Sequence, residues 1–246
     1  MKIKAKLIKS FKGMHGCLSP DGNYIAFQKW SNRDAELWLY NFIDDTSSFI
    51  SISDPTVPRW SADSKLIYFG KNKPTQDVYN YNIVSGKIFN ITLNNKSWGF
   101  NIDLLGNSVY CIGYRPSTKI VYNPVIGDPK VICSGWHPSI LGNLVASVRK
   151  INKKNYIQVL DLKSNKIVDE FEGLLPCISY NNIIWFTNGH IPNNKIYYKN
   201  IEESPYLFSE SPLRHPETRL IKNKHYLICE YAETEDSDIQ VYEFFN

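Results

Sequence analysis

The chain has 246 residues, enough for a large hydrophobic core, and this length fits a single all-β domain. Aromatic residues make up 14% of it, which is typical of sheets, and a net charge of +4 does not by itself indicate a nucleic-acid-binding protein. The lysine-rich start contains no apolar run of signal-peptide length, and no apolar stretch is long enough to span a membrane. We therefore expect a cytoplasmic protein that makes no contact with a membrane.

The five cysteines stand singly along the chain, and no Cys-x-x-Cys pair occurs. Paired cysteines at short spacing are the usual signature of a structural zinc site. We therefore expect free, mostly buried thiols and neither a metal nor a cofactor.

A turn motif recurs along the chain. Ser19-Pro20-Asp21-Gly22 precedes one apolar strand, and Ser61-Ala62-Asp63-Ser64 precedes the next, 42 residues later. The last position of the motif is expected to recur six times along the chain, at Gly22, Ser64, Gly106, Gly142, Asn181 and Asn223. A period near 40 residues with four strands in each unit is typical of a β-propeller.

The spacing predicts six blades of four antiparallel strands. They are expected at residues 14–53, 54–93, 94–134, 135–173, 174–211 and 212–246. The last blade lacks a fourth strand, which residues 3–11 are expected to supply, so that the N-terminal strand closes the last blade. Ile3, Leu7 and Phe11 are expected to be buried by this closure. The predicted fold class is therefore an all-β, six-bladed β-propeller forming a single domain.

Residues 18–27, Leu-Ser-Pro-Asp-Gly-Asn-Tyr-Ile-Ala-Phe, are followed by Glu-Leu-Trp-Leu-Tyr at 36–40. With residues 58–67, Pro-Arg-Trp-Ser-Ala-Asp-Ser-Lys-Leu-Ile, they resemble the repeat of TolB-like and WD-repeat-like propellers. The resemblance covers residues 14–92 and implies the fold alone, because the motif residues build hairpins. It implies no catalytic residue, and Trp60 is expected to belong to the core.

The first strands of a propeller line its central channel, so the residues at their starts are candidates for a ligand site. We expect a channel mouth formed by His15, Arg59, Trp98, Trp136, His137, Arg214 and His215. Aromatic rings and cations of this kind suit a small anionic or sugar-like ligand. The alternative is that these residues only fill the channel or pack between blades.

The loops between second and third strands are expected on the same face, and many of them are basic. The candidate partner-binding residues are Lys29, Arg33, Lys71, Lys73, Arg115, Arg149, Lys150, Lys153 and Lys154. The corresponding loop of the last blade is acidic instead, with Glu230, Glu233, Glu235 and Asp236. Such a surface fits a protein partner of the opposite charge pattern, whereas too few exposed aromatics accompany the cations for nucleic acid. The alternative is an ordinary solvated rim.

Catalytic motifs are absent from the sequence: it has no Gly-x-Ser-x-Gly elbow, phosphate-binding loop, dinucleotide fingerprint or His-Glu-x-x-His helix. We therefore predict a non-enzymatic binding module for a protein or a small anionic ligand. The alternative is a hydrolase or lyase with an axial site that contains His15, His137 or His215. A third possibility is a subunit of a larger assembly without a ligand of its own.

Overall fold

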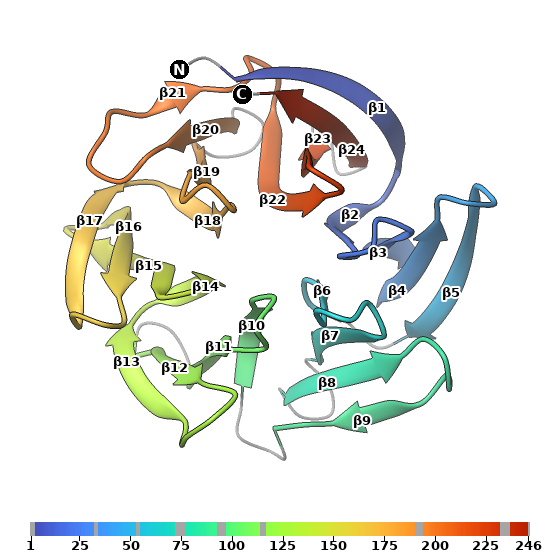
Figure 1. Ribbon diagram of the computed structural model, residues 1–246, viewed down its shortest axis with the longest axis horizontal. Coiled ribbons are helices and arrows are strands. Elements are labelled where there is room, and N and C mark those ends of the chain that lie inside the picture. Colours follow the sequence, from blue (N-terminus) through green and yellow to red (C-terminus); the bar gives the residue numbers. More distant parts are fainter. Residues whose placement is uncertain are drawn as a thin grey trace. The chain divides into compact units, whose positions relative to one another are not determined.

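The computed structural model describes residues 3–31, 34–52, 55–71, 77–92, 97–113, 117–189, 194–231 and 237–245. In these ranges the chain forms six four-stranded sheets and no helix (Figure 1). Each sheet is antiparallel, as in a propeller blade, and in five of the six sheets the four strands lie side by side in sequence order. The predicted fold class, an all-β propeller with six four-stranded blades, is confirmed. The described residues include no helix that is long and apolar enough to cross a membrane.

The strands fall into two compact units, which we call the middle unit (His15–Pro138) and the terminal unit (Met1–Met14 with Ser139–Asn246). The single-domain organisation stays a prediction.

The middle unit contains three sheets, in which four consecutive strands lie in order. They are β2 (Met14–Leu18), β3 (Tyr24–Ser31), β4 (Asp34–Asn41) and β5 (Thr46–Ile52); β6 (Arg59–Trp60), β7 (Leu66–Lys71), β8 (Asp77–Asn82) and β9 (Ile88–Asn90); and β10 (Ser97–Ile102), β11 (Ser108–Ile112), β12 (Lys119–Asn123) and β13 (Lys130–Ser134). In each sheet the second strand contributes fully buried apolar residues to the core, among them Ile25, Ile67 and Val109.

The terminal unit contains the other three sheets, except that the first three residues of β14, Trp136 to Pro138, belong to the middle unit. They are β14 (Trp136–Leu141), β15 (Leu144–Ile151), β16 (Lys154–Asp161) and β17 (Lys166–Glu172); β18 (Leu174–Ile178), β19 (Ile184–Asn188), β20 (Lys195–Lys199) and β21 (Tyr206–Leu207); and β22 (Leu213–Ile221), β23 (Lys224–Tyr231), β24 (Asp238–Phe245) and β1 (Lys4–Lys12). In the third of these sheets, the outer strand β1 comes from the other end of the sequence.

The N-terminal strand closes the last blade, as predicted. β1 runs antiparallel to β24 in a register that joins Lys4 to Phe245 and Lys12 to Asp238 (Figure 1). Beyond β1, Gly13 N donates to Ser237 O at 3.1 Å, and Ser237 Oγ donates to Gly13 O at 3.1 Å. These two bonds extend the pairing of β1 and β24 beyond Lys12 and Asp238.

The expected burial of this strand is correct for only one of its three apolar residues. Ile3 is buried in a cluster with Trp185 and Phe244, and its amide donates to the Tyr198 hydroxyl at 2.9 Å. Leu7 is 46% exposed and Phe11 is half-buried, so the prediction was wrong for Leu7 and only partly right for Phe11. The physical reason is that β1 is the outer strand of its sheet and contacts a neighbouring strand on one side only.

The Ser-x-Asp motif forms the same turn in the first two sheets. In the first, Ser19 Oγ donates to Asp21 Oδ1 at 2.6 Å and accepts the Tyr24 amide at 3.0 Å. Ser61 makes the equivalent bonds in the second at 2.6 and 2.9 Å, and Ser64 has a positive φ, as Gly22 has at the same position of the first turn. In the fifth blade the positive φ belongs to Asn182, so the marker at Asn181 was placed one residue early.

Trp60 lies in the core of the middle unit, as predicted. It is 1% exposed, its indole nitrogen donates to Cys17 O at 2.8 Å, and its ring stacks on Tyr24. Cys17, Ala26 and Phe69 surround it in the same cluster. Because Trp60 belongs to β6 and its partners to β2, β3 and β7, it joins the first two sheets of the unit.

Candidate binding surfaces

Three of the first strands share a feature that was not predicted, a bulge just after their start. In β10, β18 and β22 the register shifts between Trp98 and Asn101, Leu174 and Cys177, and Arg214 and Glu217, respectively. Within these bulges Gly99, Leu175 and His215 have positive φ values of 60°, 53° and 51°. Such bulges redirect side chains and often border functional sites.

Each of the three candidate histidines has this backbone conformation. φ is 51° at His15, 48° at His137 and 51° at His215, a region that non-glycine residues enter rarely. The signal in the sequence is the following residue, which is proline after His137 and His215 and glycine after His15. The repeated strain indicates that the backbone at these positions is held by the surrounding strands.

In the middle unit the structure brings two candidate residues together. The rings of Trp98 and His137 are perpendicular with centroids 6.3 Å apart, and Trp98 Nε1 donates to Gly113 O at 2.9 Å. Trp136, the neighbour of His137, is only 8% exposed, so little of it is available to a ligand. Arg59 is partly buried and donates to Pro58 O at 2.9 Å.

His15 is held by the deeply buried amide of Gln28. Gln28 Nε2 donates to Pro55 O, which leaves Gln28 Oε1 to accept the hydrogen bond from His15 Nδ1. This relay fixes the proton of His15 on Nδ1 and orients its ring. The five middle-unit candidates are therefore held by their own surroundings.

In the terminal unit the candidates Arg214 and His215 gather around a buried carboxylate. Arg214 Nε donates to Glu230 Oε2 at 2.8 Å, and the Glu230 side chain is 1% exposed. A ring nitrogen of His215 and a carboxylate oxygen of Glu230 lie within 4.8 Å of one another. The expectation that Glu230 is an exposed loop acid was wrong, because its charge is buried against Arg214. The other three acids of that loop, Glu233, Glu235 and Asp236, lie outside the described residues.

Four of the predicted basic residues lie on the β15–β16 hairpin, whose tip turns at Asn152 and Lys153 with positive φ. Arg149 forms an ion pair with Glu170, and Lys154 forms one with Glu172 at 2.9 Å. The hydrogen bond from Glu172 raises the pKa of Lys154. Lys150 and Lys153 are exposed, and no described residue forms an ion pair with either of them. Half of the predicted positive charge of this hairpin is thus neutralised, and half remains.

Two other predicted cations, Lys29 and Lys71, lie over aromatic rings in the middle unit. Lys29 Nζ is 4.9 Å from the ring centroid of Trp38, whose Nε1 donates to Glu36 Oε2 at 2.7 Å. Lys71 Nζ is 5.1 Å from the ring of Tyr79. Both ammonium groups are therefore held near their own sheet by cation–π contacts. The remaining predicted cations, Arg33, Lys73 and Arg115, lie outside the described residues.

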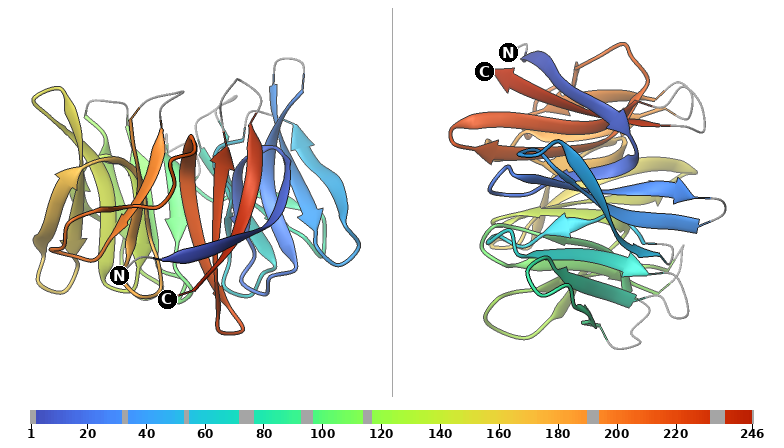
Figure 2. Two further views of the ribbon diagram at one scale, coloured as in Figure 1. Left: turned by 90° about the horizontal axis from the view of Figure 1, so that it is seen from above. Right: turned by 90° about the vertical axis from the view of Figure 1, so that its right-hand side faces the viewer.

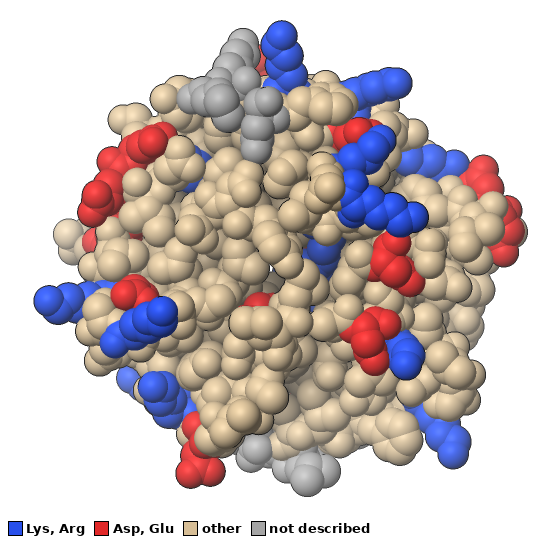
Figure 3. Space-filling model, viewed as in Figure 1, with Lys and Arg blue, Asp and Glu red and all other residues tan. Residues whose placement is uncertain are grey.

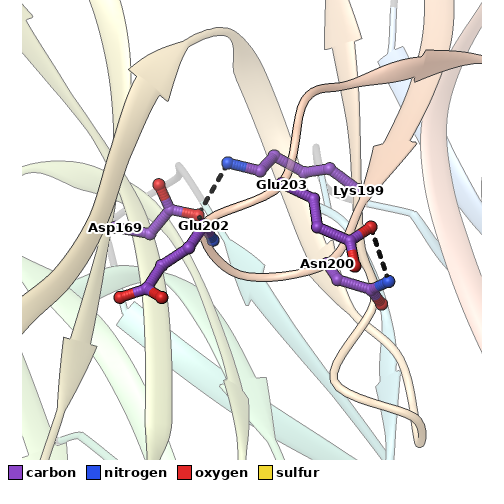
Figure 4. Close-up of polar contacts among 5 residues, drawn as sticks. All are labelled: Asp169, Lys199, Asn200, Glu202 and Glu203. Atoms are coloured by element: carbon purple, nitrogen blue, oxygen red, sulfur yellow. Dashed lines mark hydrogen bonds and ion pairs between the residues drawn. The ribbon is translucent and has the colours of Figure 1, made fainter.

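A buried ion pair that sequence reasoning missed links two sheets of the terminal unit. Lys199 Nζ donates to Asp169 Oδ2 at 2.7 Å, and the side chains are 4% and 9% exposed (Figure 4). Asp169 Oδ2 also accepts the Glu202 amide at 3.0 Å, and Lys199 Nζ lies 4.3 Å from the ring of Phe171. The two charges come from β17 and β20, so no local pattern pairs them, and their burial points to a structural role.

The cysteines are free thiols, as expected. Cys17, Cys111, Cys177 and Cys229 are buried, and Cys133 is partly exposed. Burial, with a smaller effect from the charge of Glu230, raises the pKa of Cys229 far above its ordinary value. This thiol is therefore protonated at neutral pH and is not activated as a nucleophile.

No protein-family model and no curated protein matches the chain. Solved structures are similar to it, among them TolB from Acinetobacter baumannii, with a TM-score of 0.63 and 13% identity over 91% of this chain. Oligogalacturonate lyase from Vibrio parahaemolyticus has a TM-score of 0.60 and 8% identity, covering 99% of this chain and 97% of the lyase. Acylaminoacyl peptidase from Pyrococcus horikoshii has a TM-score of 0.55 and 12% identity, covering 89% of this chain and 42% of the peptidase.

The chain spans 64% of the length of the TolB structure that it matches. At these identities the similarity shows the fold alone, which binding proteins and enzymes share. The TolB-like part of the resemblance seen in the sequence is therefore supported at the level of the fold. The WD-repeat-like part stays a prediction.

Proposed function

We propose that the protein is a non-enzymatic binding module that recognises a protein or a small anionic ligand through its basic second-to-third-strand loops and the starts of its first strands. The observation that carries the proposal is the tip of the β15–β16 hairpin. There Lys150 and Lys153 project from a tight turn, next to two other cations that glutamates of β17 neutralise. Unneutralised charge on a rigid hairpin is suited to recognition, because little conformational entropy is lost on binding.

The strained starts of the first strands support the same proposal. His137 and His215 are held in an uncommon backbone conformation beside the Trp98 ring and the Glu230 carboxylate, respectively. Aromatic rings fixed in this way offer stacking to a ligand, and the histidine ring nitrogens offer hydrogen bonds. Such a site needs no covalent chemistry.

Charge reversal of the hairpin tip tests this proposal. The double variant Lys150→Glu and Lys153→Glu is expected to weaken binding of a polyglutamate peptide roughly tenfold, because two attractive contacts become repulsive. The affinity of the wild-type protein should fall with rising salt. Isothermal titration calorimetry at two salt concentrations measures both effects.

A charge-matched control lies at the opposite end of the same sheet. Lys163 and Lys166 are exposed in the β16–β17 turn, which lies at the lower left of the left panel of Figure 2, whereas the β15–β16 hairpin rises at the upper left. Reversing them changes the net charge by the same amount and is expected to leave the affinity nearly unchanged. Equal losses in the two double variants would show that only net charge matters and would refute a hairpin site.

The second candidate function is a hydrolase or lyase with an axial histidine. The observation in its favour is the closeness of His215 to the buried Glu230 carboxylate, on a fold that lyases and peptidases also have. We expect purified protein to bind no stoichiometric divalent ion in elemental analysis and to release no unsaturated product from oligogalacturonate. An unsaturated product that disappears in the His215→Ala variant would favour the enzyme.

A further inference from the structure

The turns between third and fourth strands in the middle unit expose aliphatic side chains at the same position. Ile43 follows β4 and is 76% exposed, and Val84 follows β8 and is 78% exposed. Their amides donate to Asn41 Oδ1 and Asn82 Oδ1, both at 2.9 Å, so the two turns have the same geometry. The third turn, after β12, exposes Val125 and Ile126 at 63% and 91%.

The turn geometry does not require an aliphatic residue. In the terminal unit, the turn after β16 is closed by the same bond, from the Lys163 amide to Asp161 Oδ1 at 3.1 Å, with an exposed lysine at the tip. In the turn after β20 the tip residue is Glu202. Single exposed apolar residues are common. An exposed aliphatic residue at the same position of three successive turns in one unit instead indicates a surface that a binding partner covers.

Acidic side chains surround these turns. The exposed acids in the first-to-second-strand and third-to-fourth-strand turns of the middle unit are Asp21, Asp44, Asp45, Asp63 and Asp128, against the exposed cations Lys65, Lys87 and, at the start of β13, Lys130. Figure 3, in the view of Figure 1, shows acidic side chains over the β2–β3, β4–β5 and β6–β7 turns. The surface is therefore both apolar and negatively charged.

Two pairs of turns in the middle unit are in contact. The Asp21 amide donates to Ser64 Oγ at 3.1 Å, which joins the β2–β3 turn to the β6–β7 turn. A Cβ at Gly106 would lie 3.0 Å from Val125 Cγ2, so the β10–β11 turn, where Leu105 is 73% exposed, contacts the turn after β12. The left panel of Figure 2 shows the turns of the middle unit (blue to green) at the lower end of its sheets.

We infer that this apolar–acidic turn surface, formed by Ile43, Val84, Leu105, Val125 and Ile126 with the five aspartates, docks a cationic amphipathic segment of a partner protein. The aliphatic side chains take up the apolar residues of the segment, and the aspartates pair with its lysines or arginines. Charge complementarity selects this occupant. Two copies of the surface facing each other would bring their aspartates together, which disfavours a second copy of this chain. The surface lies at the end of the middle-unit sheets opposite to Lys29 and Lys71, so it is separate from the proposed binding loops.

The test uses three synthetic peptides of equal length: an amphipathic lysine–leucine peptide, a glutamate–leucine peptide and a lysine–serine peptide. Only the first should bind tightly, because it satisfies both the apolar and the charged requirement. Amide hydrogen exchange should show protection at residues 41–46, 82–88 and 123–128. Protection confined to other regions, or equally tight binding of the lysine–serine peptide, would overturn the inference.

Two variants separate the contributions. Replacing Ile43, Val84, Val125 and Ile126 by serine should weaken binding of the lysine–leucine peptide about tenfold or more and leave the melting temperature nearly unchanged, because these side chains are exposed. Asp44→Asn, Asp45→Asn and Asp128→Asn should weaken binding and reduce its salt dependence.

Serine replacements at Ile8, Ile167 and Phe245, which are exposed in the terminal unit, serve as the control and should leave the affinity unchanged. Equal affinity of the wild-type protein and the quadruple serine variant would overturn the inference. So would a concentration-dependent dimer in analytical ultracentrifugation that the quadruple variant abolishes, because a second copy would then be the occupant.

Discussion

Deletion of residues 1–11 is expected to leave a protein that aggregates and has no cooperative thermal transition. The deletion removes nearly all of β1, eight residues of which pair with β24, and it uncovers the edge of β24. It also removes Ile3, whose burial contributes about 1.5–3 kcal/mol. An ordinary domain is stabilised by only roughly 5–15 kcal/mol, so the loss of Ile3 together with the strand pairing is a large fraction of the total, and an uncovered edge promotes aggregation. Size-exclusion chromatography and differential scanning calorimetry measure both effects.

Point variants in the same segment show whether the burial of a side chain determines its contribution to the free energy of unfolding. Ile3→Ala should lower the free energy of unfolding by about 2–5 kcal/mol, because Ile3 is buried. Leu7→Ser should change it by less than about 0.5 kcal/mol, because Leu7 is exposed. A truncated protein that stays soluble and melts cooperatively would contradict the account of the closure.

The Lys199→Met variant is expected to lose about 3–5 kcal/mol of stability, because it leaves the Asp169 carboxylate buried without its counter-charge. The Glu202 amide still donates to Asp169 but does not neutralise it. Urea denaturation followed by tryptophan fluorescence measures the change. The double variant Lys199→Met with Asp169→Asn should recover much of the loss, since the buried charge is then gone and the carboxamide oxygen introduced by Asp169→Asn still accepts the hydrogen bond from the Glu202 amide.

A matched control lies on the same strand. Lys195 in β20 also forms an ion pair, with Glu210, but the two side chains are 36% and 77% exposed. Lys195→Met should therefore cost less than about 1 kcal/mol, in the usual range for a surface pair. If both methionine variants lose the same stability, burial is not what makes the Lys199 pair important.

The features of the fold that depend on short-range chemistry were predictable from the sequence. Ser19 and Ser61 form the same turn because each hydroxyl bonds to the aspartate two residues later, a pattern visible in the sequence. Counting the expected strands showed that the last blade lacked a fourth one, which indicated that the N-terminal strand β1 supplies it. Errors arose where several residues were chemically equivalent, as with Asn181 and Asn182, or where the edge position of a strand decided burial, as with Leu7.

The candidate site was less predictable, because it depends on contacts between strands far apart in sequence. The charges of Arg149 and Lys154 were predicted to be available to a partner, but the structure places both residues beside glutamates of β17. Glu230 was assigned to an exposed loop, although the adjacent strand places Arg214 against it. The pair of Lys199 and Asp169 crosses from one sheet to another, and no sequence pattern shows which strand positions of two blades face each other.

The most direct test of the central claim, that the protein binds a partner through its basic hairpin, compares capture from a native lysate by three proteins. These are the wild-type protein, the Lys150→Glu and Lys153→Glu variant, and the Lys163→Glu and Lys166→Glu variant. The account predicts a partner, identified by quantitative mass spectrometry, that the wild-type protein and the second variant retain and the first loses. A partner retained equally by all three would contradict it.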